Sequence, residues 1–210
     1  MDTVVICNLA LGMLGMPTIT GFDEQNNSAQ LCKKFFPVLR DRVLRDHTWS
    51  FATTARELSV AAKVGFDPDF PVVCPLPVDV IRVLRLIPEM PFRRHGAEIH
   101  TVDVPQKVVY IRRIENPNDF DPTFVEALQY LLAAELGMAN TRDAQLINSY
   151  RQEYERRLVV ARSIDSQENR DAYRPDPPRS RWLAARGASS IPIPRGKANF
   201  VKGDAGKQGA

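Results

Sequence analysis

The strongest constraint on the fold is a long apolar stripe at helical spacing in the second half of the chain. Between residues 121 and 137, large apolar residues recur every three or four positions, which places them on one face of a helix. The stripe consists of Phe124, Leu128, Leu131, Leu132 and Leu136. Asp121 and Pro122 are typical of a helix start, and Gly137 is typical of a helix end. The pattern predicts a helix over 121–137 whose apolar face must be buried against other elements.

A second stripe follows and predicts a longer helix over residues 141–165. Its apolar residues are Ile147, Tyr150, Tyr154, Leu158 and Ala161. Thr141 is in position to cap the first turn. Because only residues 138–140 connect the two predicted helices, we expect the helices to pack against each other as an antiparallel pair.

Two more helices are predicted near the start of the chain, over residues 2–15 and 28–48. Ser28 can cap the second of them. Pro37 lies in the middle of this second helix, lacks a backbone donor and crowds the preceding turn. We therefore expect the helix to be kinked or split near Phe36.

The later half of the helix predicted over 28–48 carries charges of both signs. These residues are Arg40, Asp41, Arg42, Arg45 and Asp46. Alternating charges at this spacing are typical of a solvated helix face, and we prefer that interpretation. A contact with another subunit is the alternative.

Between residues 52 and 114 the pattern changes to short β-branched runs separated by prolines and turn residues. The run over 107–114 does not alternate cleanly, which predicts a strand covered on both faces for part of its length. Gly96 can occupy a hairpin turn. The predicted fold class is therefore α+β: a four-helix bundle-like domain with a small antiparallel β insertion, over about 52–114, between the second and third helices.

Helical periodicity ends after Asp165, so we predict a domain over residues 1–165 and an extended arm over 166–210. The arm contains nine Lys or Arg against four Asp or Glu, a net charge of +5, although the whole chain carries only +3. Its prolines, glycines and charges cannot build a core. The candidate partner-binding residues are Arg174, Arg179, Arg181, Trp182 and Arg186. We favour a protein partner that orders the arm, and binding of nucleic acid is the alternative.

The common catalytic motifs are missing from the sequence. It has no Walker phosphate loop, no dinucleotide-binding GxGxxG, no G-x-S-x-G elbow and no H-E-x-x-H pair. We therefore predict no enzyme and no cofactor. The cysteines Cys7, Cys32 and Cys74 are widely spaced, which indicates reduced core residues rather than a disulfide or zinc framework.

One local cluster raises the hypothesis of a metal-dependent enzyme. Glu98 and His100 would share one face of a strand. A metal would need further ligands, which His47 is poorly placed to supply, so we prefer an exposed hairpin whose polar residues face water. The scattered acids are assigned to caps and turns; they are Asp103, Glu115, Asp119 and Asp121.

No membrane partner is expected. No run approaches the roughly 20 apolar residues that a membrane helix requires, and Asp2 stands where a secretory signal carries Lys or Arg.

The most specific local pattern runs from Phe36 to Ala52 and reads Phe-Pro-Val-Leu-Arg-Asp-Arg-Val-Leu-Arg-Asp-His-Thr-Trp-Ser-Phe-Ala. It resembles the signature of the head-to-tail adaptor (connector) proteins of short-tailed bacteriophages, the tail tubular protein A type. Weaker landmarks follow the same order as in that family, over about residues 3 to 165. They are the opening helix at Asn8–Pro17, the Leu-Pro-x-Asp strand start at Leu76–Val83, the strand at Val109–Ile111 and the helix at Phe124–Leu136. The chain departs from the family at Val73–Pro75, where an aromatic is usual, and after Ser166.

Members of this family assemble as a twelvefold ring between the portal and the tail nozzle, and line part of the channel through which DNA leaves the capsid. The resemblance implies a structural virion protein, assembled in the host cytoplasm and located at the portal vertex and tail. It implies a homo-oligomer, expected to be a dodecamer, that contacts a portal protein, a tail nozzle protein and, non-specifically, DNA. In this interpretation Trp49 and Phe51 fix the end of the second helix against the β insertion, and contact with a neighbouring subunit is the alternative.

Overall fold

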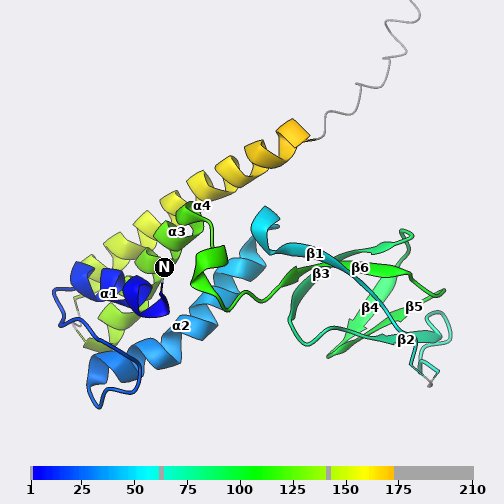
Figure 1. Ribbon diagram of the computed structural model, residues 1–210, viewed down its shortest axis with the longest axis horizontal. Helices are drawn as coiled ribbons and strands as arrows, with labels where there is room; N and C mark the ends of the chain where they lie inside the picture. Colours follow the sequence, from blue (N-terminus) through cyan, green and yellow to red (C-terminus); the bar gives the residue numbers. More distant parts are fainter. Residues whose placement is uncertain (1, 62–63, 141–142, 173–210) are drawn as a thin grey trace, which may run out of the picture. The chain divides into compact units, whose positions relative to one another are not determined.

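The computed structural model describes residues 2–61, 64–140 and 143–172 (Figure 1). These residues belong to one compact unit, Met1–Ala172. They form four α-helices and two three-stranded antiparallel sheets. The α+β class is confirmed, but the prediction of a helix bundle with one small β insertion is wrong. The strands fill the middle of the chain, form two sheets and have a hydrophobic core of their own.

Three of the helices lie close to their predicted positions, whereas the last one continues to Ala172, past the predicted end of the helix and of the domain at residue 165. The four helices are α1 (Thr3–Met13), α2 (Asn27–Asp46), α3 (Pro122–Asn140) and α4 (Ala144–Ala172). Asn26, rather than Ser28, caps α2 by accepting a hydrogen bond from the Ala29 amide at 2.7 Å. Asp143 accepts from the amides of Gln145 and Leu146 before α4, and the predicted cap Thr141 lies outside the described residues.

The helix predicted to be kinked or split near Phe36 is not split, because α2 is continuous through Pro37 (Figure 1). Pro37 lies on the exposed side of the helix. Water can therefore hydrogen-bond the Lys33 carbonyl, which has no amide donor at position 37.

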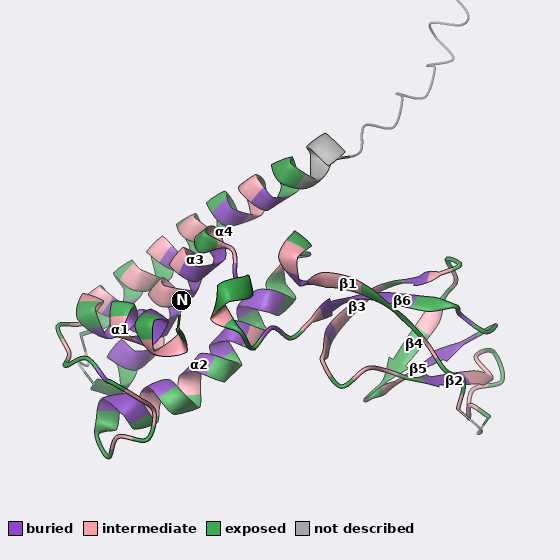
Figure 2. Cartoon of the chain, viewed as in Figure 1, coloured by how far each residue is buried: buried purple, intermediate pink, exposed green. Residues whose placement is uncertain are grey.

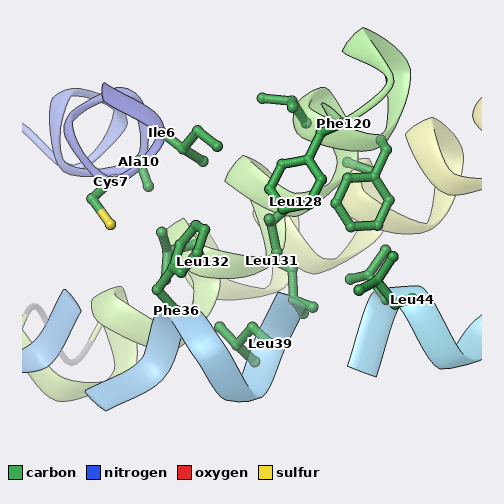
Figure 3. Close-up of a cluster of buried hydrophobic side chains, with 14 of the residues drawn as sticks. Ile6, Cys7, Ala10, Phe36, Leu39, Leu44, Phe120, Leu128, Leu131 and Leu132 are labelled. Carbon is green, nitrogen blue, oxygen red and sulfur yellow. The ribbon is translucent and has the colours of Figure 1, made fainter. Parts of the chain in front are cut away.

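The helical core surrounds α3. All five residues of the predicted stripe are at most 2 % exposed, which confirms that this face is buried. Helices α1 and α2 contribute apolar side chains to the same core as α3, and Figure 3 shows part of this cluster. The labelled residues are Ile6, Cys7 and Ala10 of α1, Phe36, Leu39 and Leu44 of α2, and Phe120, Leu128, Leu131 and Leu132 at or in α3. Buried and exposed residues alternate along α4, as expected of a helix that covers the core from one side (Figure 2).

Six strands form the two sheets. They are β1 (Thr53–Glu57), β2 (Val72–Pro75), β3 (Val80–Ile87), β4 (Phe92–His95), β5 (Glu98–Thr101) and β6 (Lys107–Arg112). The first sheet has the order β1-β6-β3, and the second has the order β2-β5-β4. Gly96 joins β4 to β5 with a φ of 62°, which confirms the predicted hairpin turn. Two short 3₁₀ turns, η1 (Ser50–Ala52) and η2 (Pro117–Asp119), lie before β1 and before α3.

Strand β6 contributes to both cores. Val108 and Tyr110 belong to a second core, which also contains Cys74, Leu86 and Ile99. Ile111 belongs to the helical core. The prediction that this strand is covered on both faces is therefore confirmed. The three cysteines are free and buried, also as predicted. Within the described ranges, no helix is long and apolar enough to cross a membrane.

We predict that Ile99→Ala lowers the free energy of unfolding by about 2–5 kcal/mol, because it leaves a cavity in the second core. Ile99 is fully buried. Val102→Ala is the matched control, since Val102 is 51 % exposed, and its effect should stay within about 0.5 kcal/mol. Chemical denaturation measures both variants. Equal effects would contradict a second packed core.

Candidate functional site at the end of helix α2

The charged half of α2 makes specific contacts within the chain. The Asp41 carboxylate accepts hydrogen bonds from Arg40 Nε at 2.9 Å and from Arg113 Nε at 2.8 Å. Arg40 itself is only 7 % exposed. Because Arg113 directly follows β6, its ion pair with Asp41 ties α2 to the first sheet.

Two arginines tie the end of α2 to β3 in both directions. Arg45 Nη1 donates to the Ile81 carbonyl at 3.0 Å. Arg82 of β3 donates to the Arg45 carbonyl at 3.0 Å and to the Thr48 hydroxyl at 2.7 Å. The carbonyls in the last turn of a helix have no partner inside the helix, so a cationic donor is favoured there.

Asp165 of α4 binds the segment that follows α2. Asp165 is 7 % exposed. One of its carboxylate oxygens accepts hydrogen bonds from the Ser50 amide at 2.9 Å and from the Ser50 hydroxyl. The other carboxylate oxygen lies 3.1 Å from His47 Nε2. One buried carboxylate therefore fixes α4 to the turn η1.

This Ser, His and Asp cluster does not have the geometry of a catalytic triad. In a triad the imidazole lies between the hydroxyl and the carboxylate, so that it can take the hydroxyl proton. Here the carboxylate of Asp165 lies between Ser50 and His47. The Ser50 hydroxyl donates its hydrogen bond to the Asp165 carboxylate and not to an imidazole base. The arrangement therefore suits a structural anchor.

Trp49 fills the space between the end of α2 and α3. It is fully buried, and its indole nitrogen donates to the Val43 carbonyl at 2.9 Å. Its ring lies 5.3 Å from that of Phe124 and 5.7 Å from that of Phe51. The predicted core role of Trp49 is confirmed. The core that holds Trp49 and Phe51 contains Ile81 and Ile111 of the strands, and the ring partners of both residues include Phe124 of α3.

Tyr154 adds a contact between α4 and α2. Its hydroxyl donates to Asp46 Oδ2 at 3.2 Å. Burial, followed by the nearby charge of Asp46, raises the pKa of Tyr154 above its ordinary value.

We call this set the α2 junction: Asp41, Arg45, Asp46, His47, Trp49 and Ser50, with their partners Ile81, Arg82, Arg113, Phe124, Tyr154 and Asp165. The interpretation of the charged run as a solvated face is wrong for Arg40, which is buried, and holds only in part for Asp41, which is half-buried. Arg45 and Asp46 are exposed, as predicted, and also make contacts within the chain. Arg42 is exposed, as expected. The sequence analysis also missed Asp165. The sequence pattern did indicate that Asp165 is buried, because this residue continues the stripe of Tyr154, Leu158 and Ala161 at helical spacing.

The Glu98 and His100 cluster has a different setting from the one predicted. His100 is 4 % exposed rather than facing water, and its Nδ1 has no hydrogen-bond partner in the described part of the chain. Strand register places His95 opposite Glu98, and the rings of His95 and His100 lie 4.6 Å apart. Among the described residues, no group of three or more His, Cys, Asp or Glu side chains is arranged to hold a metal ion.

The carboxylates assigned to caps and turns behave as predicted where their contacts are described. Asp121 accepts from the Thr123 amide at 2.7 Å at the start of α3. Asp103 accepts from the Val104 amide at 2.7 Å in a turn. The candidate partner-binding residues lie outside the described residues; they are Arg174, Arg179, Arg181, Trp182 and Arg186.

Comparison with known proteins does not add to this description. A scan against protein-family models and a search of curated proteins both found no match for the chain. The α2 junction is therefore interpreted from its own contacts and from the resemblance over residues 3 to 165.

We predict that Asp165→Ala lowers the free energy of unfolding by about 2–4 kcal/mol, because the Ser50 donors lose their acceptor and the contact with His47 is lost. Glu168→Ala is the matched control, since Glu168 is an exposed acid on the same helix. Denaturant unfolding at neutral pH measures the difference. If the two variants are equally stable, Asp165 does not anchor α4.

A second prediction concerns alkaline pH. Because the pKa of Tyr154 is raised in the folded state, the unfolded state loses this proton first, at about pH 10. The folded state then holds more protons, so stability falls as pH rises above that value. In Tyr154→Phe the fall between about pH 10 and 12 should be shallower. Tyr130→Phe serves as the control, and a slope unchanged from that of the native chain in Tyr154→Phe would refute the assignment.

Proposed function

We propose that this protein is a ring-forming head-to-tail adaptor that joins a phage portal to the tail nozzle and lines part of the DNA exit channel. One observation carries the proposal. The residues with the most specific resemblance to the adaptor family, Phe36–Ala52, supply most of the α2 junction. They contact β3, the end of β6, α3 and α4.

This concentration of contacts suits a protein whose task is to hold surfaces in a fixed relation. Ion pairs and hydrogen bonds from one short segment connect the helices to the first sheet and to the last helix. Such a joint resists relative movement of those elements. Repeated contacts around a closed ring then add up, since closure makes the last contacts effectively intramolecular.

Residues 166–210 complete the proposal as a strap. Their basic and aromatic residues would bind a neighbouring subunit or the portal, with Arg174, Arg179, Arg181, Trp182 and Arg186 as contact residues. The protein would act in the virion, at the portal vertex and tail, after assembly in the host cytoplasm.

A nucleic-acid-binding module is the second candidate function. The observation that favours it is the concentration of positive charge after residue 166. It requires binding to short DNA duplexes that weakens steeply with salt, because phosphate contacts release counterions. A binding assay at two salt concentrations tests it.

The test of the adaptor function is assembly on the portal protein of the same phage. We predict that the full-length protein, produced with that portal, forms a complex whose native mass corresponds to twelve copies of this chain. The protein alone and the portal alone are the controls. A chain that does not associate with the portal, or associates without a fixed stoichiometry, would exclude the proposal.

A further inference from the structure

Three arginines from different elements gather around Ile81, near the start of β3. Arg45 Nη1, from the last turn of α2, donates to the Ile81 carbonyl at 3.0 Å, and Arg94 Nη1, from β4, donates to the same oxygen at 3.2 Å. Arg82 follows Ile81 directly in β3 and donates to the Arg45 carbonyl at 3.0 Å and to the Thr48 hydroxyl at 2.7 Å. We call Arg45, Arg82 and Arg94 the arginine cluster.

No carboxylate neutralises the arginine cluster in the part of the chain that the structure describes. None of its three guanidinium groups belongs to an ion pair there. Arg82 Nε is buried and finds no hydrogen-bond acceptor among the same residues. The C-terminal end of α2 supplies a partial negative charge of only about half a unit. Most of the positive charge of the cluster is therefore uncompensated within the fold.

The charged residues nearby are engaged elsewhere. Four acids lie on or beside the same elements, and each has interactions of its own; they are Asp41 and Asp46 of α2, Asp79 before β3, and Glu98 of β5. The cation next to Arg94 in β4 is Arg93, which is paired with Asp67. No neighbouring acid is left to balance the cluster.

The composition of the chain does not explain this concentration of positive charge. Residues 1–172 contain 20 Lys or Arg against 23 Asp or Glu, so acids outnumber cations in this part of the sequence. Arg45 and Arg94 nevertheless share one carbonyl oxygen, and like charges held so close repel each other. A bound anion would remove that repulsion.

The two outer arginines also keep free donors for a ligand. Within the described ranges, Arg45 Nε and Nη2 have no acceptor, and neither does Arg94 Nη2. Both residues are exposed, so an anion from solvent can reach them. Because both guanidinium groups are held by the same oxygen, their remaining donors lie close together.

This set of donors suits a phosphate group better than a carboxylate. A carboxylate has two oxygens and one charge, which a single arginine fork can satisfy. A phosphate group has more oxygens and, when free, carries more charge, so two guanidinium groups can bind it at once.

We propose that the arginine cluster is a binding site for a phosphate group, either free or in the backbone of a nucleic acid. Arg45 and Arg94 bind the phosphate oxygens through their remaining donors. Arg82 holds the end of α2 in place and adds its charge. The inference goes beyond the proposed adaptor function and does not rest on it.

The test measures binding of inorganic phosphate to the full-length protein by calorimetry at fixed ionic strength. We expect saturable binding, weakened roughly tenfold by Arg45→Ala and by Arg94→Ala, because each removes charged hydrogen bonds. In each variant the other arginine still donates to the Ile81 carbonyl, so the fold should persist, and denaturant unfolding checks this. Acetate at the same concentration should bind at least tenfold more weakly than phosphate, by roughly the same argument.

Arg85→Ala is the matched control. It removes the same charge from an exposed arginine of β3 outside the cluster, and should change the affinity for phosphate by less than about twofold.

A short DNA duplex distinguishes the two sources of the phosphate group. If the site takes a backbone phosphate, the salt dependence of duplex binding should be shallower by about one unit in Arg94→Ala than in Arg85→Ala. If it takes free phosphate, these two variants bind the duplex equally, while their affinities for inorganic phosphate still differ.

Absence of saturable phosphate binding, or equal effects of Arg94→Ala and Arg85→Ala in both assays, would overturn the proposal. Acetate that binds as tightly as phosphate would overturn it as well. None of these results bears on assembly on the portal, so failure of the phosphate site and failure of the adaptor function can be told apart.

Discussion

The structure depends on how the polar groups at the end of α2 are satisfied. The Arg45 carbonyl lies where a helix has no internal donor, and Arg82 supplies that donor from β3. Arg45 in turn donates to the Ile81 carbonyl of the same strand. The chain then turns through η1, where the Ser50 amide finds its acceptor in Asp165 of α4. A buried polar group left without a hydrogen-bond partner would destabilise the fold by about 1–3 kcal/mol. The polar and charged residues of this segment therefore supply or bind the partners that these groups need.

The helices were predictable because their information is local. Periodicity identified the face of α3, and capping identified its start. The predicted end at Gly137 was wrong, because the helix continues through this buried glycine to Asn140. The two sheets were not predictable, because β1 pairs with β6 across most of the β region and β2 pairs with β5 rather than with a sequence neighbour. Short strands carry little register information of their own. The lack of alternation in β6 did reveal burial on both faces, since that property belongs to one strand alone.

The α2 junction was misinterpreted for a related reason. Alternating charges identify a polar face, but they do not show whether water or a distant side chain occupies it. Arg113 and Asp165 come from segments far along the chain, and only the fold brings them to α2. His100 was misplaced in the same way, because the segment before β2 covers it. A Cβ on Gly65 would lie 3.1 Å from His100 Nδ1 and 2.5 Å from the Phe70 carbonyl oxygen, so this close approach requires glycine.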